Sequence, residues 1–188
     1  MAKIDIGIEK IVKRLSKLEK TQDKIIPRIR EIVRFCSNAI KLMHGGKISQ
    51  AKKMVDKAKK ILSNVKKEEK LSYMFLQAEQ EVVEASILLS IIENKSIPKA
   101  EELGVEDSSY LTGICDCVGE LRRQMLEQLK KGRKKEALRY FEVMDAIADE
   151  LVAIRFSDSL VRGFRQKQDI VRSQLERARS EILHTRGK

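Results

Sequence analysis

The sequence predicts an all-α fold, a bundle of about six or seven helices, on three observations. Aromatic residues make up 4% of the 188 residues, and there are only two prolines. Long segments are rich in Lys, Glu, Leu and Ile, which are typical of helical proteins. Within them, apolar residues recur at helical spacing. The length fits one hydrophobic core, so we expect a single domain over residues 1–188.

The N-terminal segment shows two helical series. Apolar residues recur over residues 8–18 and again, after a polar stretch at 21–23, over residues 25–43. Pro27 is tolerable in the first turn of a helix but would kink one continuous long helix. The second series ends at Gly45-Gly46.

A strongly basic helix follows, with its lysines largely on the outward face. Residues 1–70 carry 20 Lys and Arg against 8 Asp and Glu, whereas residues 71–188 carry 19 against 20. Clustered cations neutralise phosphates and release their counterions, so this part is a candidate for binding a polyanion. A solvated basic face explains the same charge equally well.

Five further segments complete the predicted bundle. We expect helices at about 68–92, 107–131, 134–154 and 158–183, with a loop and one short helix at 93–104. The connections are short, as is typical of helical bundles.

An acid interrupts the predicted core stripe of the helix at 68–92. Glu81 occupies an inward position, and Glu84, three residues on, is followed on its own side by apolar residues. Burying two carboxylates costs several kcal/mol per ion unless positive charge meets them.

The helix at 107–131 offers a second pair of acids. Asp116 and Glu120 are spaced i, i+4, so they share one face with Gly113 and Gly119. A glycine inside a helix costs about 1 kcal/mol relative to alanine. Two of them on one face indicate close approach by another backbone or by a ligand.

Two helices with two carboxylates each can converge into a cluster of four acids. Mg²⁺ or Mn²⁺ prefers such oxygen ligands, and either metal can activate water and stabilise charge on a phosphodiester. In the alternative, Glu81 and Glu84 pair with cations of a neighbouring helix, and the other two acids are solvated beside Arg123. Spacing alone favours this alternative, because charged helix faces are common.

The other candidate groups argue against several classes of protein. Cys36, Cys115 and Cys117 lack the spacing of a disulfide framework, which fits a reducing compartment. The last two lie about 200° apart around a helix, which excludes chelation by that pair, so we expect buried apolar roles for the thiols. Neither His44 nor His184 has a partner constellation, so the sequence gives no support to a histidine-based nuclease or protease.

No apolar run is long enough for a membrane span, and charges interrupt the first residues where a signal peptide would need an apolar stretch. We therefore expect a cytoplasmic protein without a membrane partner.

Two segments resemble the translin family, most closely its translin-associated factor X branch. They are Glu79-Gln-Glu-Val-Val-Glu-Ala85 and Tyr110-Leu-Thr-Gly-Ile-Cys-Asp-Cys-Val-Gly-Glu-Leu-Arg122. That family pairs an E-x-x-E-A helix with a Y-L-x-G-x-x-D-x-x-G-E-L helix, separated by a loop and a short helix. A compact single-chain version of this kind resembles the archaeal branch.

The resemblance implies a translin-like helical bundle that assembles into a hollow homo-oligomeric shell, an octamer. It also implies a Mg²⁺-dependent (or Mn²⁺-dependent) endoribonuclease acting on single-stranded RNA. Glu81, Glu84, Asp116 and Glu120 match the four acids of the catalytic branch, as metal ligands and catalytic residues. The alternative is a non-catalytic, translin-like binder of single-stranded RNA or DNA.

Phosphate contacts are predicted for the N-terminal arginines Arg28, Arg30 and Arg34, of which the last two are one turn apart. Arg122 and Arg123 follow the acids of the second pair. They can neutralise the scissile phosphate, or pair with Glu120 and hold the site. Since aromatic residues are few, we expect little base stacking and slight sequence preference.

Overall fold

The computed structural model describes residues 7–68 and 71–186, with side chains as far as His184. Within these ranges the chain forms seven α-helices and one 3₁₀ helix and no strand, which confirms the predicted all-α fold. The elements are α1 (Ile8–His44), α2 (Ile48–Glu68), the 3₁₀ helix η1 (Ser72–Met74), α3 (Leu76–Ile92), α4 (Ala100–Leu103), α5 (Asp107–Lys130), α6 (Lys134–Val152) and α7 (Phe164–Arg186). Residues 1–6 and 69–70 of the predicted basic part, and residues 187–188, lie outside the described ranges.

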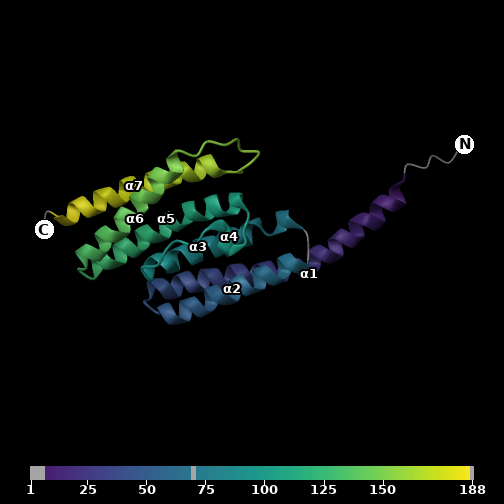
Figure 1. Cartoon of the computed structure of the whole chain (residues 1–188), viewed down its shortest axis with the longest axis horizontal. Helices are drawn as coiled ribbons and strands as arrows, with labels where there is room; N and C mark the ends of the chain where they lie inside the picture. The colour runs from purple at the N-terminus through teal and green to yellow at the C-terminus, as the bar shows by residue number, and fades with distance from the viewer. Residues whose placement is uncertain (1–6, 69–70, 187–188) are drawn as a thin grey trace, which may run out of the picture.

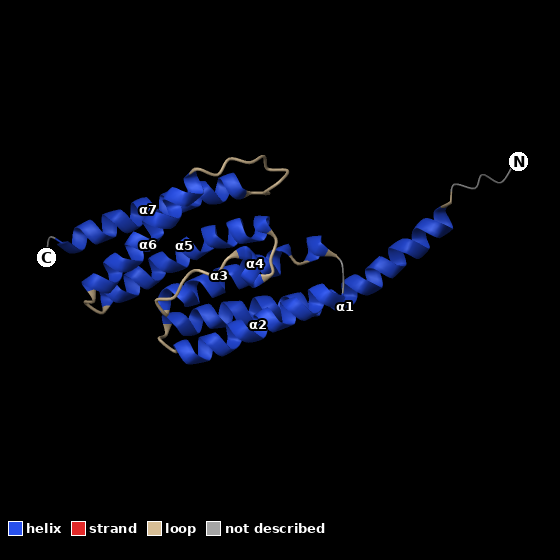
Figure 2. Cartoon of the chain, viewed as in Figure 1, coloured by secondary structure: helices blue, strands red, loops and turns tan. Residues whose placement is uncertain are grey.

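The helices pack in three layers (Figure 1). α1 and α2 form one outer pair, α3 and α5 lie in the middle, and α6 and α7 form the other outer pair. The only regular secondary structure in the described chain is helical (Figure 2). No helix of that part combines the length and the apolarity needed to cross a bilayer.

The middle helix α3 is buried on almost every side, because α1, α2 and α5 all pack against it. Consecutive residues such as Val82 and Val83, and again Ile87 and Leu88, are fully buried. After Leu76 and Gln77, which are exposed, every residue of α3 is buried or half-buried. This placement is what makes the acids of α3 unusual.

The expected division of the N-terminal segment into two helices is wrong. α1 runs without a break through Pro27, and its N-terminal part extends beyond the rest of the bundle (Figure 1). Proline removes the hydrogen bond to the carbonyl four residues earlier, on Asp23. Both residues are exposed, so water can take the place of that bond and the helix continues.

Two predicted helix starts are also wrong. The helix expected from residue 68 begins at Leu76, after η1. The helix expected from residue 158 begins at Phe164, because the preceding residues form turns. There the backbone N–H of Gly163, at φ 72°, donates to Asp158 Oδ1 at 2.7 Å.

Candidate functional site

The middle helices α3 and α5 touch at Gly113. A Cβ atom at this position would lie 2.7 Å from the Gln80 carbonyl oxygen and 2.7 Å from Val83 Cβ. No side chain fits there, so the absence of one lets the two backbones approach. Gly119 differs, because a Cβ added there would meet nothing within 4 Å. Close packing within the chain thus explains Gly113 and does not explain Gly119.

This approach brings together the acids that we call the acid cluster, Glu81, Glu84, Asp116 and Glu120. Glu84 is half-buried. Burial, followed by the charges of Asp116, Glu81 and Glu120, raises its pKa from 4.5 to about 8. The pKa of Glu81 is also raised, by burial and then by Asp116. The four carboxylates therefore repel one another across the contact between α3 and α5.

One cation from α7 enters this cluster. Lys167 Nζ donates to both oxygens of Asp116, at 2.5 Å and 2.6 Å, and Gln80 Nε2 donates to Asp116 Oδ2 at 2.5 Å. The charge of Lys167 lowers the pKa values of Glu81 and Glu84 but does not cancel the repulsion and burial that raise them. Sequence reasoning missed Lys167, because it lies 51 residues from Asp116 in a helix that reads as a charged surface helix.

The last residue of α1 reaches the same cluster. His44 Nε2 forms a hydrogen bond with Glu120 Oε2, and 7% of the His44 side chain is exposed. Its other ring nitrogen, Nδ1, is buried and has no hydrogen-bond partner in the described structure. The sequence showed no partner constellation around His44, so its contact with Glu120 was missed. Among the described residues, His184 forms hydrogen bonds only with Ser180, one turn earlier on α7.

The pairing differs from the alternative drawn from the sequence. Asp116 forms a close ion pair with Lys167, whereas Glu81 and Glu84 form no ion pair within the described ranges. Arg123, with 58% of its side chain exposed, lies 3.9 Å from Glu120. Among the four acids of the cluster, negative charge is therefore least compensated at Glu81 and Glu84.

The donor set suits a hard divalent cation, because it consists of carboxylate oxygens that carry more negative charge than their protein partners neutralise. A cation beside Glu84 would relieve the repulsion that raises its pKa. As the side chains stand, no group of three or more His, Cys, Asp or Glu residues in the described chain is arranged to hold a metal. Metal binding would need these side chains to rearrange, since Asp116 is engaged by Lys167.

The cysteines have the buried roles expected for them. Cys36, Cys115 and Cys117 are free and buried. Burial, followed by the charge of Asp116, raises the pKa of Cys115 to about 12. Burial likewise raises the pKa of Cys117, and Glu84 adds to the shift. These thiols therefore stay protonated at neutral pH.

The arginines predicted to bind phosphate fall into two groups. Arg28 forms an ion pair with Glu68 at the end of α2, which raises the pKa of the guanidinium. Arg30 and Arg34 are exposed and form no ion pair with any residue of the described ranges.

Arg122 does not face the acid cluster as a free cation. It pairs with Glu181 and donates to Gln174 Oε1 at 3.3 Å, which ties α5 to α7. Of the two adjacent arginines, only Arg123 remains exposed beside the acids.

A third acid of α3, Glu79, lies outside the acid cluster and is fully buried, and its role was not predicted. It accepts hydrogen bonds from Lys66 Nζ at 2.5 Å and from the Glu106 N–H at 3.1 Å. Lys66 also donates to the Gly104 carbonyl at 2.8 Å. We call these residues the Glu79 cluster; it joins α2, α3 and the segment between α4 and α5.

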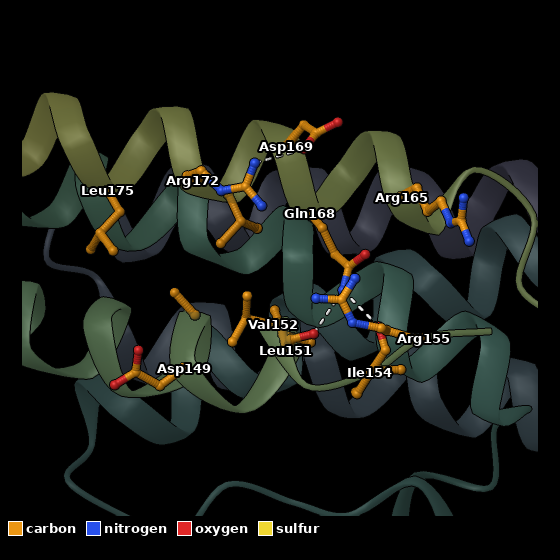
Figure 3. A pocket seen from close by; sticks show the side chains of 12 residues that line it. Asp149, Leu151, Val152, Ile154, Arg155, Arg165, Gln168, Asp169, Arg172 and Leu175 are labelled. Atoms are coloured by element: carbon orange, nitrogen blue, oxygen red, sulfur yellow. Dashed lines mark hydrogen bonds and ion pairs between the residues drawn. The ribbon is translucent and has the colours of Figure 1, made fainter.

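A separate pocket of about 410 Å³ lies between α6 and α7 and contains none of the four acids (Figure 3). Gln168 reaches across it from α7 and donates to the carbonyls of Leu151 and Ile154, at 2.7 Å and 3.1 Å. These bonds satisfy carbonyls at the C-terminal end of α6. They fix the first turn of α7, which carries Lys167.

Known proteins share this architecture. A protein of Methanocaldococcus jannaschii, described only as uncharacterized, is 31% identical over 180 residues, which is 92% of this chain and 80% of that protein. AfC3PO in complex with duplex RNA is 33% identical, with a TM-score of 0.85 over 96% of this chain and 97% of that one. AfC3PO alone gives a TM-score of 0.87 at the same identity and coverage, and apo-NeC3PO gives 0.83 at 25% identity over 97% of this chain and 98% of its own. The family model of translin matches residues 7–181, so the chain belongs to the translin family.

Proposed function

We propose that this chain is a Mg²⁺-dependent endoribonuclease that cuts single-stranded RNA within a homo-oligomeric shell, with Mn²⁺ able to replace Mg²⁺. The observation that carries this proposal is the acid cluster, in which burial and then three neighbouring carboxylates raise the pKa of Glu84 to about 8. Perturbed carboxylates gathered at one place are typical of catalytic sites. The similarity to AfC3PO, solved with duplex RNA, supports RNA as the partner.

Glu81, Glu84, Asp116 and Glu120 are the residues that would hold the metal. When bound, Mg²⁺ would supply Lewis acidity and positive charge beside the scissile phosphate. In the hydrolysis, a water oxygen forms a bond to phosphorus while one ester P–O bond breaks. The proton of the water passes to a carboxylate of the cluster, and the departing ribose oxygen gains a proton from solvent. Glu84 suits the role of the carboxylate that accepts the proton of the water, since a raised pKa makes its ionised form a stronger base.

RNA would reach the cluster along cationic side chains. Arg30 and Arg34 are exposed one turn apart on α1, and Arg123 is exposed beside Glu120. Each phosphate contact adds to the salt dependence of binding. Replacing Arg30 and Arg34 together by alanine should weaken RNA binding and flatten the plot of log affinity against log salt. Arg177→Ala, an exposed charge removal on α7, is the control and should change neither.

An assembly would cover the apolar face of α1 outside the bundle. Ile8, Ile11, Val12, Leu15 and Leu18 are 40% to 58% exposed there, which is unusual for large apolar residues in one helix. We propose that this face packs against further copies in an octamer. Light scattering should show the octamer mass for the wild type and a smaller mass for Leu15→Glu.

The decisive experiment incubates labelled single-stranded RNA with the protein in Mg²⁺ or in EDTA. Cleavage should require Mg²⁺ and should fall on the order of 100-fold or more in Glu84→Gln and in Asp116→Asn. Glu150→Gln, an exposed acid on α6, is the matched control and should cut normally.

Three other results are informative. Cleavage that survives both substitutions would remove the acid cluster from the mechanism. RNA binding without cleavage in Mg²⁺ would favour a non-catalytic, translin-like binder of single-stranded RNA or DNA. Faster cleavage of duplex RNA than of single-stranded RNA would correct the substrate class.

A further inference from the structure

The acid cluster contains its own cation. Both oxygens of Asp116 accept hydrogen bonds from Lys167 Nζ, and no other residue of the described chain forms an ion pair with Asp116. Lys167 also acts on the neighbouring acids, because its charge lowers the pKa values of Glu81 and Glu84. The ammonium thus neutralises Asp116 and partly offsets the negative charge of the neighbouring acids.

The backbone of Lys167 is firmly placed, although its side chain can move. The next residue, Gln168, is bonded to two carbonyls at the end of α6 (Figure 3). The Lys167 N–H donates to the Gly163 carbonyl at 3.1 Å, which begins α7. About a quarter of the Lys167 side chain, 24%, is exposed, so the ammonium has a path to solvent along its four-carbon stem.

We propose that Lys167 competes with the divalent cation for Asp116 and, once displaced, binds a phosphate oxygen of the RNA. This inference rests on the function proposed above. It makes Lys167 the link between metal binding and substrate binding.

The competition follows from the geometry of Asp116. With both oxygens bonded to the ammonium, Asp116 can join a metal only if Lys167 gives up at least part of this contact. A doubly charged cation among four carboxylates is attracted more strongly than a single ammonium. The two cations also repel each other, so metal binding drives the ammonium outward.

The displaced ammonium needs a new anion, and an RNA phosphate beside the cluster provides one. An ammonium offers three hydrogen-bond donors and a compact charge, which suits a single phosphate oxygen. RNA would therefore stabilise the metal-bound arrangement, and the metal would favour the RNA-bound position of Lys167. Such reciprocity is required of any two coupled binding events.

The test measures Mn²⁺ affinity by calorimetry, without RNA, in the full-length wild type, Lys167→Met and Lys167→Arg. Methionine removes the competing charge at similar length, so Mn²⁺ should bind on the order of ten-fold more tightly. Arginine holds a carboxylate with two parallel N–H groups, so Mn²⁺ should bind more weakly than to the wild type. Arg177→Met, an exposed charge removal on the same helix, is the control and should match the wild type.

Steady-state cleavage of single-stranded RNA at saturating Mg²⁺ supplies the second readout. Lys167→Met should raise KM for RNA more than it lowers kcat, although its metal affinity is higher. Opposite effects on metal and RNA separate this role from a purely structural one, which would weaken both.

Lys167→Met with wild-type Mn²⁺ affinity or wild-type KM would overturn the inference while leaving a cleaving wild-type enzyme intact. If Lys167→Met does not fold, Lys167→Arg decides, and Mn²⁺ affinity equal to or above that of the wild type overturns the inference. A wild-type protein that neither binds Mn²⁺ nor cuts RNA would remove the proposed function itself, and the inference with it.

Discussion

Helix α3 carries two carboxylates five residues apart in opposite electrostatic circumstances. Glu79 is fully buried, and its oxygens accept hydrogen bonds from Lys66 and from a backbone N–H. Glu84 is less buried and forms no ion pair within the described part of the chain. Burial, followed by the charges of three other acids, raises its pKa to about 8. The more deeply buried acid is the compensated one.

The difference shows that burial alone does not mark a functional acid. In the Glu79 cluster, a cation neutralises the carboxylate and one backbone N–H donates to it, as the folded state requires of a deeply buried charge. In the acid cluster, like charges are held together by the packing of α3 against α5. Such an arrangement costs stability, and it suits a site that takes up a cation or a proton.

Replacing Glu79 should have the largest effect on stability. Glu79→Gln leaves the Lys66 ammonium without its carboxylate, and we expect the free energy of unfolding to fall by about 3–4 kcal/mol. Glu84→Gln removes an uncompensated acid and should leave the free energy equal or raise it at pH 8. Urea denaturation in EDTA measures both. Equal losses in the two variants would contradict the contrast between the clusters.

The pH dependence of stability should come next in size. The pKa of Glu84 is about 8 in the folded chain and 4.5 ordinarily, so between these values the folded state binds more protons than the unfolded state. The contribution of Glu84 to the free energy of unfolding is therefore fully present below pH 4.5. It should fall by roughly 2–4 kcal/mol as pH rises to 8. The raised pKa of Glu81 acts in the same direction.

Urea titrations from pH 5 to pH 8 in EDTA would show this fall in the wild type and a smaller one in Glu84→Gln. Added Mg²⁺ should reduce it, because a bound cation favours the ionised acids. Stability that rises over this range in the wild type would rule out the repulsion described for the acid cluster.

The two glycines of α5 should respond in opposite directions. Gly113→Ala puts a Cβ atom 2.7 Å from the backbone of α3, and we expect a loss of about 1–2 kcal/mol even after the gain in helix propensity. Thermal unfolding measures this loss. The substitution should also weaken the contact between α3 and α5 that brings the acids together, which would lower Mg²⁺-dependent cleavage.

Gly119→Ala is the matched control and should give the smallest effect. A Cβ atom there meets nothing within 4 Å, so stability should rise by up to about 1 kcal/mol. If RNA approaches this face of α5, cleavage should fall although the fold is more stable. A melting temperature that drops as far as in Gly113→Ala would show that Gly119 is packed after all.

What the sequence revealed was mostly local. Helical periodicity predicts the bundle, and i, i+3 and i, i+4 spacings put each pair of acids on its own helix. The close contact at Gly113 was also foreseeable, because a glycine inside a helix has a cost that needs a reason. These signals all act within a few turns of one helix.

The rest of the site depends on packing between distant segments. His44 meets Glu120 across 76 residues, and Lys167 meets Asp116 across 51. Nothing near either residue in the sequence separates it from an ordinary surface side chain. The break before α3 was missed for a related reason, since Leu71 and Met74 continue the apolar spacing although the chain forms η1 there.

The most direct test of the contrast is a crystal structure of the protein soaked in Mn²⁺, with anomalous differences recorded at the manganese edge. We expect a peak among Glu81, Glu84, Asp116 and Glu120, with Lys167 Nζ moved away from Asp116, and no peak at Glu79. An acid cluster without manganese, at a concentration that supports RNA cleavage, would contradict this contrast.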